Sequence, residues 1–277
     1  MTRREILQLV RSAAEPLYGA GEAGSVARMV LEELGGVSWS ESILRPDEEC
    51  EIEDFSRIAD EIKRGRPIQY IIGRAEFCDL SMVVREGVLI PRPESEELVR
   101  WVVGECRGDE RVLDLCSGSG ALAIAISCKL ADAEVSAVEL SDEALAIAKE
   151  NIERLAPSVK LIKGDVLEVE RLLDGSYSVI VANPPYIPCS ERVDMRTNVV
   201  DYEPSMALFV PDDDPLLFYR SIAKSGLKLL KSGGKIYFEV HENFASQTAE
   251  MMAEMGYRVE IRADINDKPR MVCGVRG

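Results

Sequence analysis

The sequence predicts an α/β fold with a doubly wound parallel sheet and a small helical region ahead of it. From Arg111 onward, short runs rich in Val, Ile and Leu alternate with longer segments whose apolar residues recur at helical spacing. This alternation is typical of a parallel sheet with helices on both faces. Before residue 66 the apolar residues recur at helical spacing alone. A chain of 277 residues is long enough for one large and one small domain.

The first 74 residues are expected to form a helical domain that binds a partner. Apolar residues recur at helical spacing in the segments 6–17, 26–34 and 55–62. The pair Gly35-Gly36 follows the second segment and is a common signal for the end of a helix. A further short helix is expected around Trp39–Leu44.

A connector at 75–93 and a large domain at 94–277 are expected to follow. In the connector, three short strands are predicted at 76–80, 81–85 and 88–90, with Glu86-Gly87 as a hairpin turn. The strands expected in the large domain are 111–115, 134–140, 159–163, 177–182, 235–240, 258–263 and 271–275. Its expected helices are 94–106, 120–130, 142–155, 215–230 and 243–255. Ligands of such sheets bind beyond the carboxyl ends of the strands.

Composition and charge argue against several classes of protein. No apolar run approaches the roughly 18 residues of a membrane helix, and the first residues lack a signal-peptide core, so we expect a cytoplasmic protein. The seven cysteines form no C-x-x-C pair, so neither a disulfide framework nor a metal site is indicated. With His241 as the single histidine, a Ser-His-Asp mechanism is not expected. The net charge of −16 disfavours stable binding to nucleic acid.

A turn of small residues follows the first strand of the expected sheet, and it reads Cys116-Ser117-Gly118-Ser119-Gly120. Such a turn lets the backbone approach a ligand at a helix N-terminus. Three strands also end in or near an acid: Asp114, Glu139 and Asp165. One strand-end carboxylate can bind ribose hydroxyls, whereas three acids would repel the pyrophosphate of a dinucleotide. We therefore predict an S-adenosylmethionine site rather than an NAD site.

The fourth strand of this sheet ends in Asn183-Pro184-Pro185-Tyr186. An amide nitrogen is a poor nucleophile, and its two hydrogens need acceptors when it is buried. We expect the Asn183 side-chain oxygen and the Pro184 carbonyl to accept one hydrogen each, so that the lone pair of the nitrogen faces a methyl donor. The prolines stiffen the loop, and Tyr186 offers an aromatic face to the target. A plain Asn-Pro turn that caps the strand is the alternative.

Several stretches of the chain match motifs of one family. They are R-P-I-Q-Y-I-I-G (66–73), V-L-I-P-R-P-E (88–94), V-L-D-L (112–115), A-V-E (137–139), N-P-P-Y (183–186) and Y-E-P (202–204). N-P-P-Y is shared with adenine and other amino-group methyltransferases, whereas L-I-P-R-P-E after a helical N-terminal domain is more specific. The chain resembles the peptide chain release factor glutamine N(5)-methyltransferases over nearly its whole length.

The resemblance implies methylation of the glutamine amide in the Gly-Gly-Gln loop of class I release factors. It also implies a seven-stranded sheet with an antiparallel last strand, and a helical domain that helps to hold the partner. By position, the cofactor-binding residues are Cys116, Ser117, Gly118, Ser119, Gly120, Glu139, Asp165, Val166 and Asn183. Val166 would lie near the adenine. The glutamine site would be Asn183, Pro184, Pro185 and Tyr186, with Asn183 and Pro184 as the catalytic pair.

The chain departs from the family pattern at a few positions. Cys116 stands where the turn usually begins with glycine, which is tolerable if its φ is negative. Pro215 follows three aspartates where a glycine pair is usual, and is expected to start a helix. His241 stands where glycine is more usual. Arg92 either forms a structural ion pair or contacts the cofactor or the partner.

Three alternatives to a release factor methyltransferase stay open. A close relative that methylates a glutamine of a ribosomal protein is the nearest. An enzyme that methylates a flipped adenine could use the same N-P-P-Y geometry. Both parts of the chain are acidic, with 10 Lys and Arg against 16 Asp and Glu in residues 1–80 and 23 against 33 in the rest, which disfavours that enzyme. The intact Asn183 argues against a non-catalytic module that only binds S-adenosylmethionine.

Overall fold

The computed structural model describes all residues from Met1 to Gly277. The chain divides into two compact units: residues 1–74 with 196–202, and residues 75–195 with 203–277. Residues 75–93, expected to be a separate connector, therefore belong to the larger unit. The short segment 196–202 belongs to the helical unit.

The smaller unit is helical, as the apolar spacing predicted. Its elements are α1 (Arg3–Met29), a π-helical turn η1 (Val30–Leu34), α2 (Trp39–Leu44), α3 (Phe55–Lys63), α4 (Ile68–Ile72) and α8 (Thr197–Val200). The Thr2 side chain accepts a hydrogen bond from the Glu5 backbone N–H and so caps the start of α1. Gly19, with φ 76° and ψ 165°, interrupts α1 between the first two expected segments. Ile6, Val10 and other residues of these helices form one apolar core.

The larger unit contains a seven-stranded sheet in the order β10-β11-β9-β6-β3-β4-β5. Its strands are β3 (Arg111–Leu115), β4 (Glu134–Glu139), β5 (Lys160–Lys163), β6 (Tyr177–Ala182), β9 (Leu230–Glu239), β10 (Tyr257–Ala263) and β11 (Pro269–Arg276). Strands β5, β4, β3, β6 and β9 pair in parallel. Strand β11 is antiparallel to both β9 and β10. The predicted sheet with its antiparallel last strand is confirmed.

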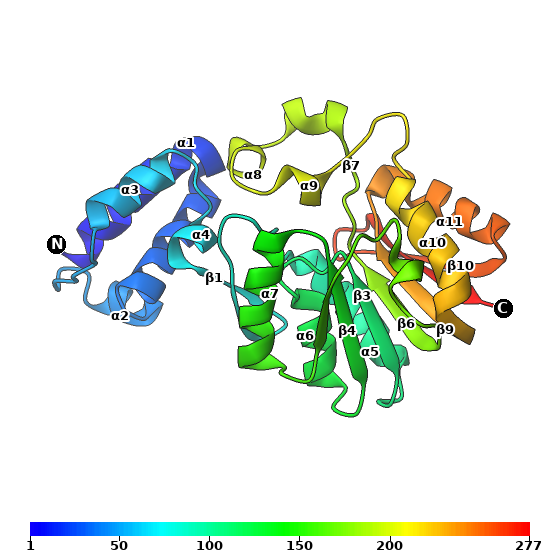
Figure 1. Cartoon of the computed structure of the whole chain (residues 1–277). Helices are drawn as coiled ribbons and strands as arrows, with labels where there is room; N and C mark the ends of the chain where they lie inside the picture. The colour runs from blue at the N-terminus through cyan, green and yellow to red at the C-terminus, as the bar shows by residue number, and fades with distance from the viewer. The chain divides into compact units, whose positions relative to one another are not determined.

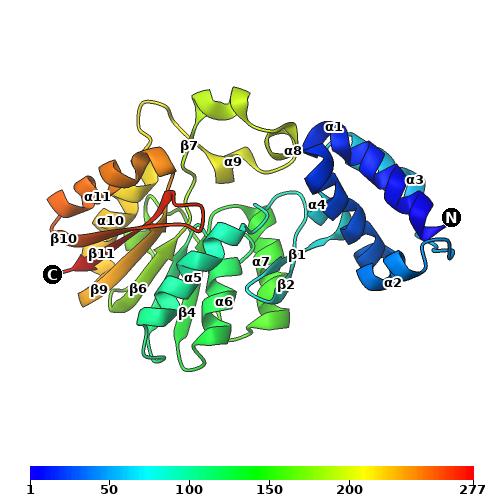
Figure 2. The ribbon, with the colours of Figure 1, turned by 180° about the vertical axis from the view of Figure 1, so that it is seen from behind.

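Helices cover both faces of this sheet, as Figures 1 and 2 show from opposite sides. On one face, α5 (Pro93–Glu105), α6 (Ala121–Lys129) and α7 (Asp142–Leu155) share a core with residues such as Val112 and Val179. On the other face, α10 (Leu217–Leu229) and α11 (Ala245–Glu254) pack on residues such as Leu113 and Ile180. Because successive side chains of a strand point to opposite faces, neighbouring apolar residues supply both cores. Helix α10 begins two residues after Pro215, its expected start.

The expected hairpin lies at another position. Strands β1 (Arg74–Phe77) and β2 (Leu80–Val83) form a two-stranded sheet. The two residues between them, Cys78 and Asp79, have φ values of 51° and 65°, as a tight hairpin turn with two left-handed residues requires. A turn is present at Glu86-Gly87, where the Val88 N–H donates to the Arg85 carbonyl at 3.4 Å, but it joins no hairpin, and the strand expected at 88–90 is wrong. Gly87 has φ 102°, and a Cβ there would lie 2.8 Å from the Cβ of Glu143, so this position needs glycine for close packing.

A long excursion between β6 and α10 was not expected from the sequence. It contains β7 (Ile187–Pro188), η3 (Cys189–Asp194), α8, α9 (Ser205–Leu208) and β8 (Phe209–Val210), and β7 pairs in parallel with β8. Two further 3-10 turns are η2 (Val169–Arg171) and η4 (Glu242–Phe244). The pairing of β7 with β8 returns the chain to the carboxyl ends of the sheet strands. Beside this pairing, the Tyr186 N–H donates to the Leu208 carbonyl at 3.3 Å.

Candidate active site

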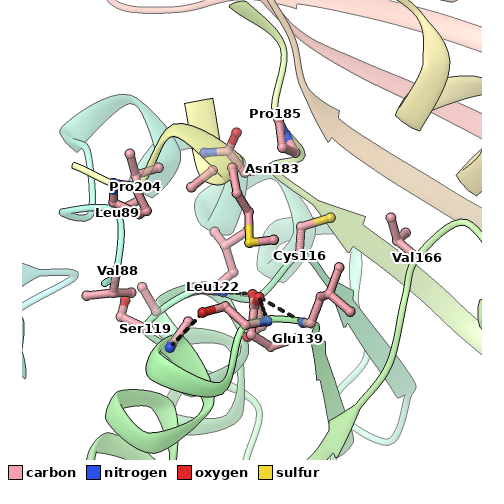
Figure 3. Close-up of a pocket in the computed structure, with 18 of the residues that line it drawn as sticks. Val88, Leu89, Cys116, Ser119, Leu122, Glu139, Val166, Asn183, Pro185 and Pro204 are labelled. Carbon is pink, nitrogen blue, oxygen red and sulfur yellow. Dashed lines mark hydrogen bonds between the residues drawn. The ribbon is translucent and has the colours of Figure 1, made fainter. Parts of the chain in front are cut away.

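A cavity of about 320 Å³ lies at the carboxyl ends of β3, β4 and β6. Its walls come from the turn after β3, the end of β4, the segment before α5, the end of β6 and the α9 region. Figure 3 shows Glu139 on one side of this cavity and Asn183 on the other, with Cys116 between them. The topology alone therefore brings together the two motifs that the sequence singled out.

The turn after β3 approaches the cavity through left-handed backbone conformations. Cys116, Gly118 and Gly120 have φ values of 61°, 56° and 83°. The expectation that Cys116 has a negative φ is wrong, so a side chain occupies a backbone region that favours glycine. Burial, followed by the charge of Glu139, raises the pKa of the Cys116 thiol well above its usual value. Ser117, Gly118 and Ser119 also line the cavity, whereas Gly120 does not.

The carboxylate of Glu139 is held by backbone donors. Its Oε2 accepts from the Gly118 N–H at 2.7 Å, and its Oε1 accepts from the N–H groups of Leu140 and Ser141 at 2.8 and 2.9 Å. A carboxylate has about four lone-pair sites, so these bonds leave one site on Oε2. This oxygen is available to a ligand hydroxyl in the cavity.

Asp114 supports the turn from below and does not line the cavity. Its Oδ2 accepts from the Ser117 hydroxyl at 2.8 Å and from the Ala123 N–H at 3.2 Å, while its Oδ1 is buried without a partner. Burial raises the pKa of Asp114 to about 7, against the effect of these two donors, and the charge of Glu139 raises it further. An orphaned buried oxygen is costly when charged.

An apolar slot adjoins Glu139. Val138, Leu140, Val166 and Leu122 line the cavity there, together with Asp165. The Oδ1 of Asp165 accepts from the Leu167 N–H at 2.8 Å, which fixes the short segment after β5. An acid for a ribose, an apolar slot beside it and a turn of small residues are the parts that an adenosine moiety needs. The residues present therefore fit S-adenosylmethionine.

Asn183 enters the cavity from the end of β6. Its side-chain nitrogen donates to the Ser95 hydroxyl at 3.3 Å, so its side-chain oxygen is the end left for a substrate. Pro185 also lines the cavity, but Pro184 and Tyr186 do not. The Tyr186 hydroxyl instead donates to Glu239 Oε1 at 3.3 Å. Its ring meets the His241 ring edge-on, at 6.1 Å between centroids, and not an open surface as the sequence suggested.

Arg92, which lines the cavity, forms an ion pair with Glu203. Arg92 Nη2 lies 2.5 Å from Glu203 Oε1, and Glu203 Oε2 accepts from the Ile90 N–H at 3.1 Å. The Glu203 side chain is 1% exposed. The pair joins the segment before α5 to the segment that contains Pro204, which also lines the cavity. Arg92 was expected either to form a structural ion pair or to contact the cofactor or the partner, and the structure shows the ion pair.

Sequence reasoning missed Ser95, Glu203 and Glu239 as parts of this site. Glu239 ends the apolar run of β9, and a lone acid at that position is a signal of the same kind as Asp114. Glu203 lies in the Y-E-P stretch that matches the family, but nothing in the sequence indicated its partners Ile90 and Arg92. Ser95 carried no signal, because its partner Glu239 lies 144 positions away in the sequence.

Comparison with known proteins identifies two matching domain families. The family described as "Methyltransferase small domain" matches residues 96–201, and the "PrmC N-terminal domain" matches residues 8–73. A solved methyltransferase from Pyrococcus furiosus covers 72% of this chain and 89% of its own, with a TM-score of 0.54 and 20% identity. That likeness shows the fold alone. None of the helices here is long and apolar enough to cross a membrane.

Full-length relatives are more informative. A release factor glutamine methyltransferase from Bacteroides thetaiotaomicron is 38% identical over 275 residues, which is 98% of this chain and 99% of that protein. One from Bacillus subtilis is 33% identical over 98% of both chains. Identity of this size over nearly the whole of both sequences includes the helical unit as well as the sheet. The chain belongs to the family of release factor glutamine methyltransferases.

Proposed function

We propose that this protein transfers a methyl group from S-adenosylmethionine to the side-chain amide nitrogen of the glutamine in the Gly-Gly-Gln motif of class I peptide chain release factors. One observation carries the proposal: the Asn183 nitrogen is tied to Ser95, so its oxygen is left to accept from an NH2 group in the cavity. Membership of the family, with relatives named for this activity, supports the same substrate.

The methyl donor has a matching set of side chains. When bound, S-adenosylmethionine supplies an electrophilic methyl group on its sulfur. Glu139 Oε2 would accept a hydrogen bond from its ribose, and Val138 and Val166 would flank its adenine. The turn from Cys116 to Gly120 would let the backbone approach the rest of the molecule. Together these groups would hold the donor on the side of the cavity opposite Asn183.

The acceptor amide needs orientation rather than a general base. The Asn183 side-chain oxygen would accept one hydrogen of the glutamine NH2. The carbonyl of Pro184, a residue that does not itself line the cavity, would accept the other hydrogen from the position next to Asn183. With both hydrogens held in one plane, the lone pair of the nitrogen is directed at the methyl donor, and the charge that develops on nitrogen is stabilised by two oxygens. Pro185 would bound the glutamine side chain, because it lines the cavity beside Asn183. We place Tyr186 behind this site, where it supports Glu239.

The remaining features concern the partner and the compartment. We assign residues 1–74 to binding of the release factor, because they lie outside the unit that contains the cavity. The seven cysteines are free thiols, which is typical of a reducing compartment such as the cytoplasm. The net charge of −16 opposes stable binding to nucleic acid. A glutamine of a ribosomal protein is the second candidate substrate, because the same two acceptors would orient its amide.

A labelling assay tests the proposal. The protein is incubated with labelled S-adenosylmethionine and, in separate reactions, a class I release factor, the same factor with its loop glutamine changed to alanine, ribosomal proteins, and duplex DNA. We expect label only in the unmodified factor. Label in DNA, or equal label in the glutamine-less factor, would refute it. Asn183→Ala should lower the rate by more than about 100-fold while the Kd for S-adenosylmethionine changes by less than about tenfold.

A further inference from the structure

A buried chain of hydrogen bonds leads from Asn183 into the protein. The Asn183 side-chain nitrogen donates to Ser95 Oγ at 3.3 Å, and the Ser95 hydroxyl donates to Glu239 Oε2 at 2.5 Å. The other carboxylate oxygen of Glu239 accepts from the Tyr186 hydroxyl at 3.3 Å. Ser95 is 5% exposed and Glu239 is 2% exposed. The three residues joined to Asn183 thus come from α5, β9 and the loop after β6.

The direction of these hydrogen bonds is set by the ionised form of Glu239. An ionised carboxylate can only accept, so the single hydrogen of the Ser95 hydroxyl points at Glu239. Ser95 Oγ then offers a lone pair to Asn183, and only the NH2 end of the Asn183 amide can meet it. The oxygen end of that amide is consequently directed to the cavity. Without an obligate acceptor behind it, the Ser95 hydroxyl could donate to the Asn183 oxygen and turn the amide round.

The orientation of this amide decides which substrate group it can hold. An oxygen directed to the cavity accepts from the NH2 of a glutamine, whereas an NH2 there would face another donor. Two donors that face each other leave both without a partner, which costs more than the loss of an ordinary hydrogen bond. The argument rests on the proposed function, because it takes a side-chain amide as the acceptor of the methyl group.

We propose that Ser95 and Glu239 are positioning residues, which act through Asn183 by fixing its amide with the oxygen toward the substrate. Neither needs to touch the reacting nitrogen. Their contribution appears in kcat, because the donors and acceptors around the amide are matched in the transition state. Tyr186 supports this arrangement from the other side of the carboxylate.

The charge of Glu239 also makes the arrangement dependent on pH. Burial raises the pKa of Glu239; hydrogen bonds from Ser95 and Tyr186 and the charge of Arg270 oppose this effect, and Glu94 adds to it. A protonated Glu239 can donate to Ser95 Oγ and release the hydroxyl hydrogen toward Asn183. We therefore expect kcat to fall as the pH falls through the pKa of Glu239. Ser95→Ala should remove this acid limb, because the change at Glu239 no longer reaches Asn183.

Steady-state kinetics of four variants test the proposal. Ser95→Ala and Glu239→Gln should each lower kcat by about tenfold or more, as expected for one mispaired hydrogen bond, while the Kd for S-adenosylmethionine by calorimetry changes by less than about threefold. The double variant should be no more than about threefold slower than the slower single variant, because both act on one amide. Ser95→Thr keeps the hydroxyl and should keep kcat within about threefold.

Glu105→Gln is the matched control. Glu105 is a carboxylate on α5 that accepts from Trp101, Lys235 and Tyr237, and it does not line the cavity. Its variant should lose stability on heating and keep the wild-type kcat. If Glu105→Gln lowers kcat as much as Glu239→Gln does, the effect is structural and the proposal is overturned.

Specificity gives a second readout. Binding of wild type and Glu239→Gln is compared for two release factors that carry glutamine or glutamate at the target position. The preference for glutamine should shrink by about tenfold in the variant, since its Asn183 amide can present either end.

An unchanged preference, or a wild-type kcat in both Ser95→Ala and Glu239→Gln, would overturn the proposal. An inactive wild-type protein would instead refute the proposed function. If Glu239→Gln does not fold, the Ser95→Ala and Ser95→Thr pair decides the question.

Discussion

Asp114 gives a stability prediction that can be worked out from the structure. Its carboxyl is 0% exposed, one oxygen has no partner, and burial raises its pKa to about 7. The native protein therefore holds this proton over a pH range in which the unfolded chain, with a pKa near about 3.9, has lost it. For a group with a raised native pKa of this kind, stability is lost as the pH rises.

The magnitude follows from proton linkage. From about pH 5 to about pH 7 the native state binds about one proton more than the unfolded state. Over this range the free energy of unfolding falls by about 1.4 kcal/mol for each pH unit, and above about pH 7 it changes little further. The Asp114 carboxyl should therefore lower the free energy of unfolding by about 2.7 kcal/mol across this range. Asp114→Asn keeps an acceptor for Ser117 and cannot titrate, so this loss should be absent in the variant.

Urea unfolding in a Trp39→Phe background measures the effect of Asp114 on the stability of the larger structural unit. Trp39 lies in the helical unit and Trp101 in the larger unit, so the remaining tryptophan fluorescence reports on the sheet and its helices. The free energy of unfolding of Asp114→Asn minus that of Asp114 should rise by about 2.7 kcal/mol from about pH 5 to about pH 8. A difference that stays constant within about 0.5 kcal/mol would refute the reasoning.

Variants at three further positions test other parts of the site. Cys116→Gly should be more stable than Cys116→Ala by about 1 kcal/mol in urea unfolding, because φ at this position is 61°; an equal or lower stability would show that the left-handed backbone carries no strain. Arg92→Ala leaves the buried Glu203 carboxylate without its ion-pair partner and should cost about 3 kcal/mol in the same assay, whereas a cost below about 1 kcal/mol would place the pair among weak surface contacts. Glu139→Ala should weaken S-adenosylmethionine binding by about tenfold to 100-fold in calorimetry, and an unchanged Kd would contradict its contact with the ribose.

The sheet could be predicted because its strands carry their own signal. Tyr177–Ala182 is a short run, apolar except for Ser178, that is buried along its whole length, and strands of this kind need no distant partner to be recognised. The location of the cavity could be predicted as well, because parallel strands place their carboxyl ends at one edge of the sheet. For this reason the sequence alone predicts that Glu139 and Asn183 face the same site.

The missing parts depend on the path of the chain in space. The hairpin turn lies at Cys78 and Asp79, residues that adopt positive φ with no glycine to mark them. The left-handed conformation of Cys116 is likewise set by the turn around it. Glu203 reaches Ile90 and Arg92 across more than 100 positions of sequence. No local periodicity or turn signal encodes a contact of that range, so these features required the structure.

The most direct measurement of the central claim is the position of the methyl group on the product. A class I release factor is incubated with S-adenosylmethionine and either the wild-type protein or Asn183→Ala, and its Gly-Gly-Gln peptide is sequenced by tandem mass spectrometry. We predict one methyl group on the side-chain nitrogen of that glutamine with the wild-type protein, and none with the variant. A methyl group on another residue, or equal methylation by Asn183→Ala, would contradict the account.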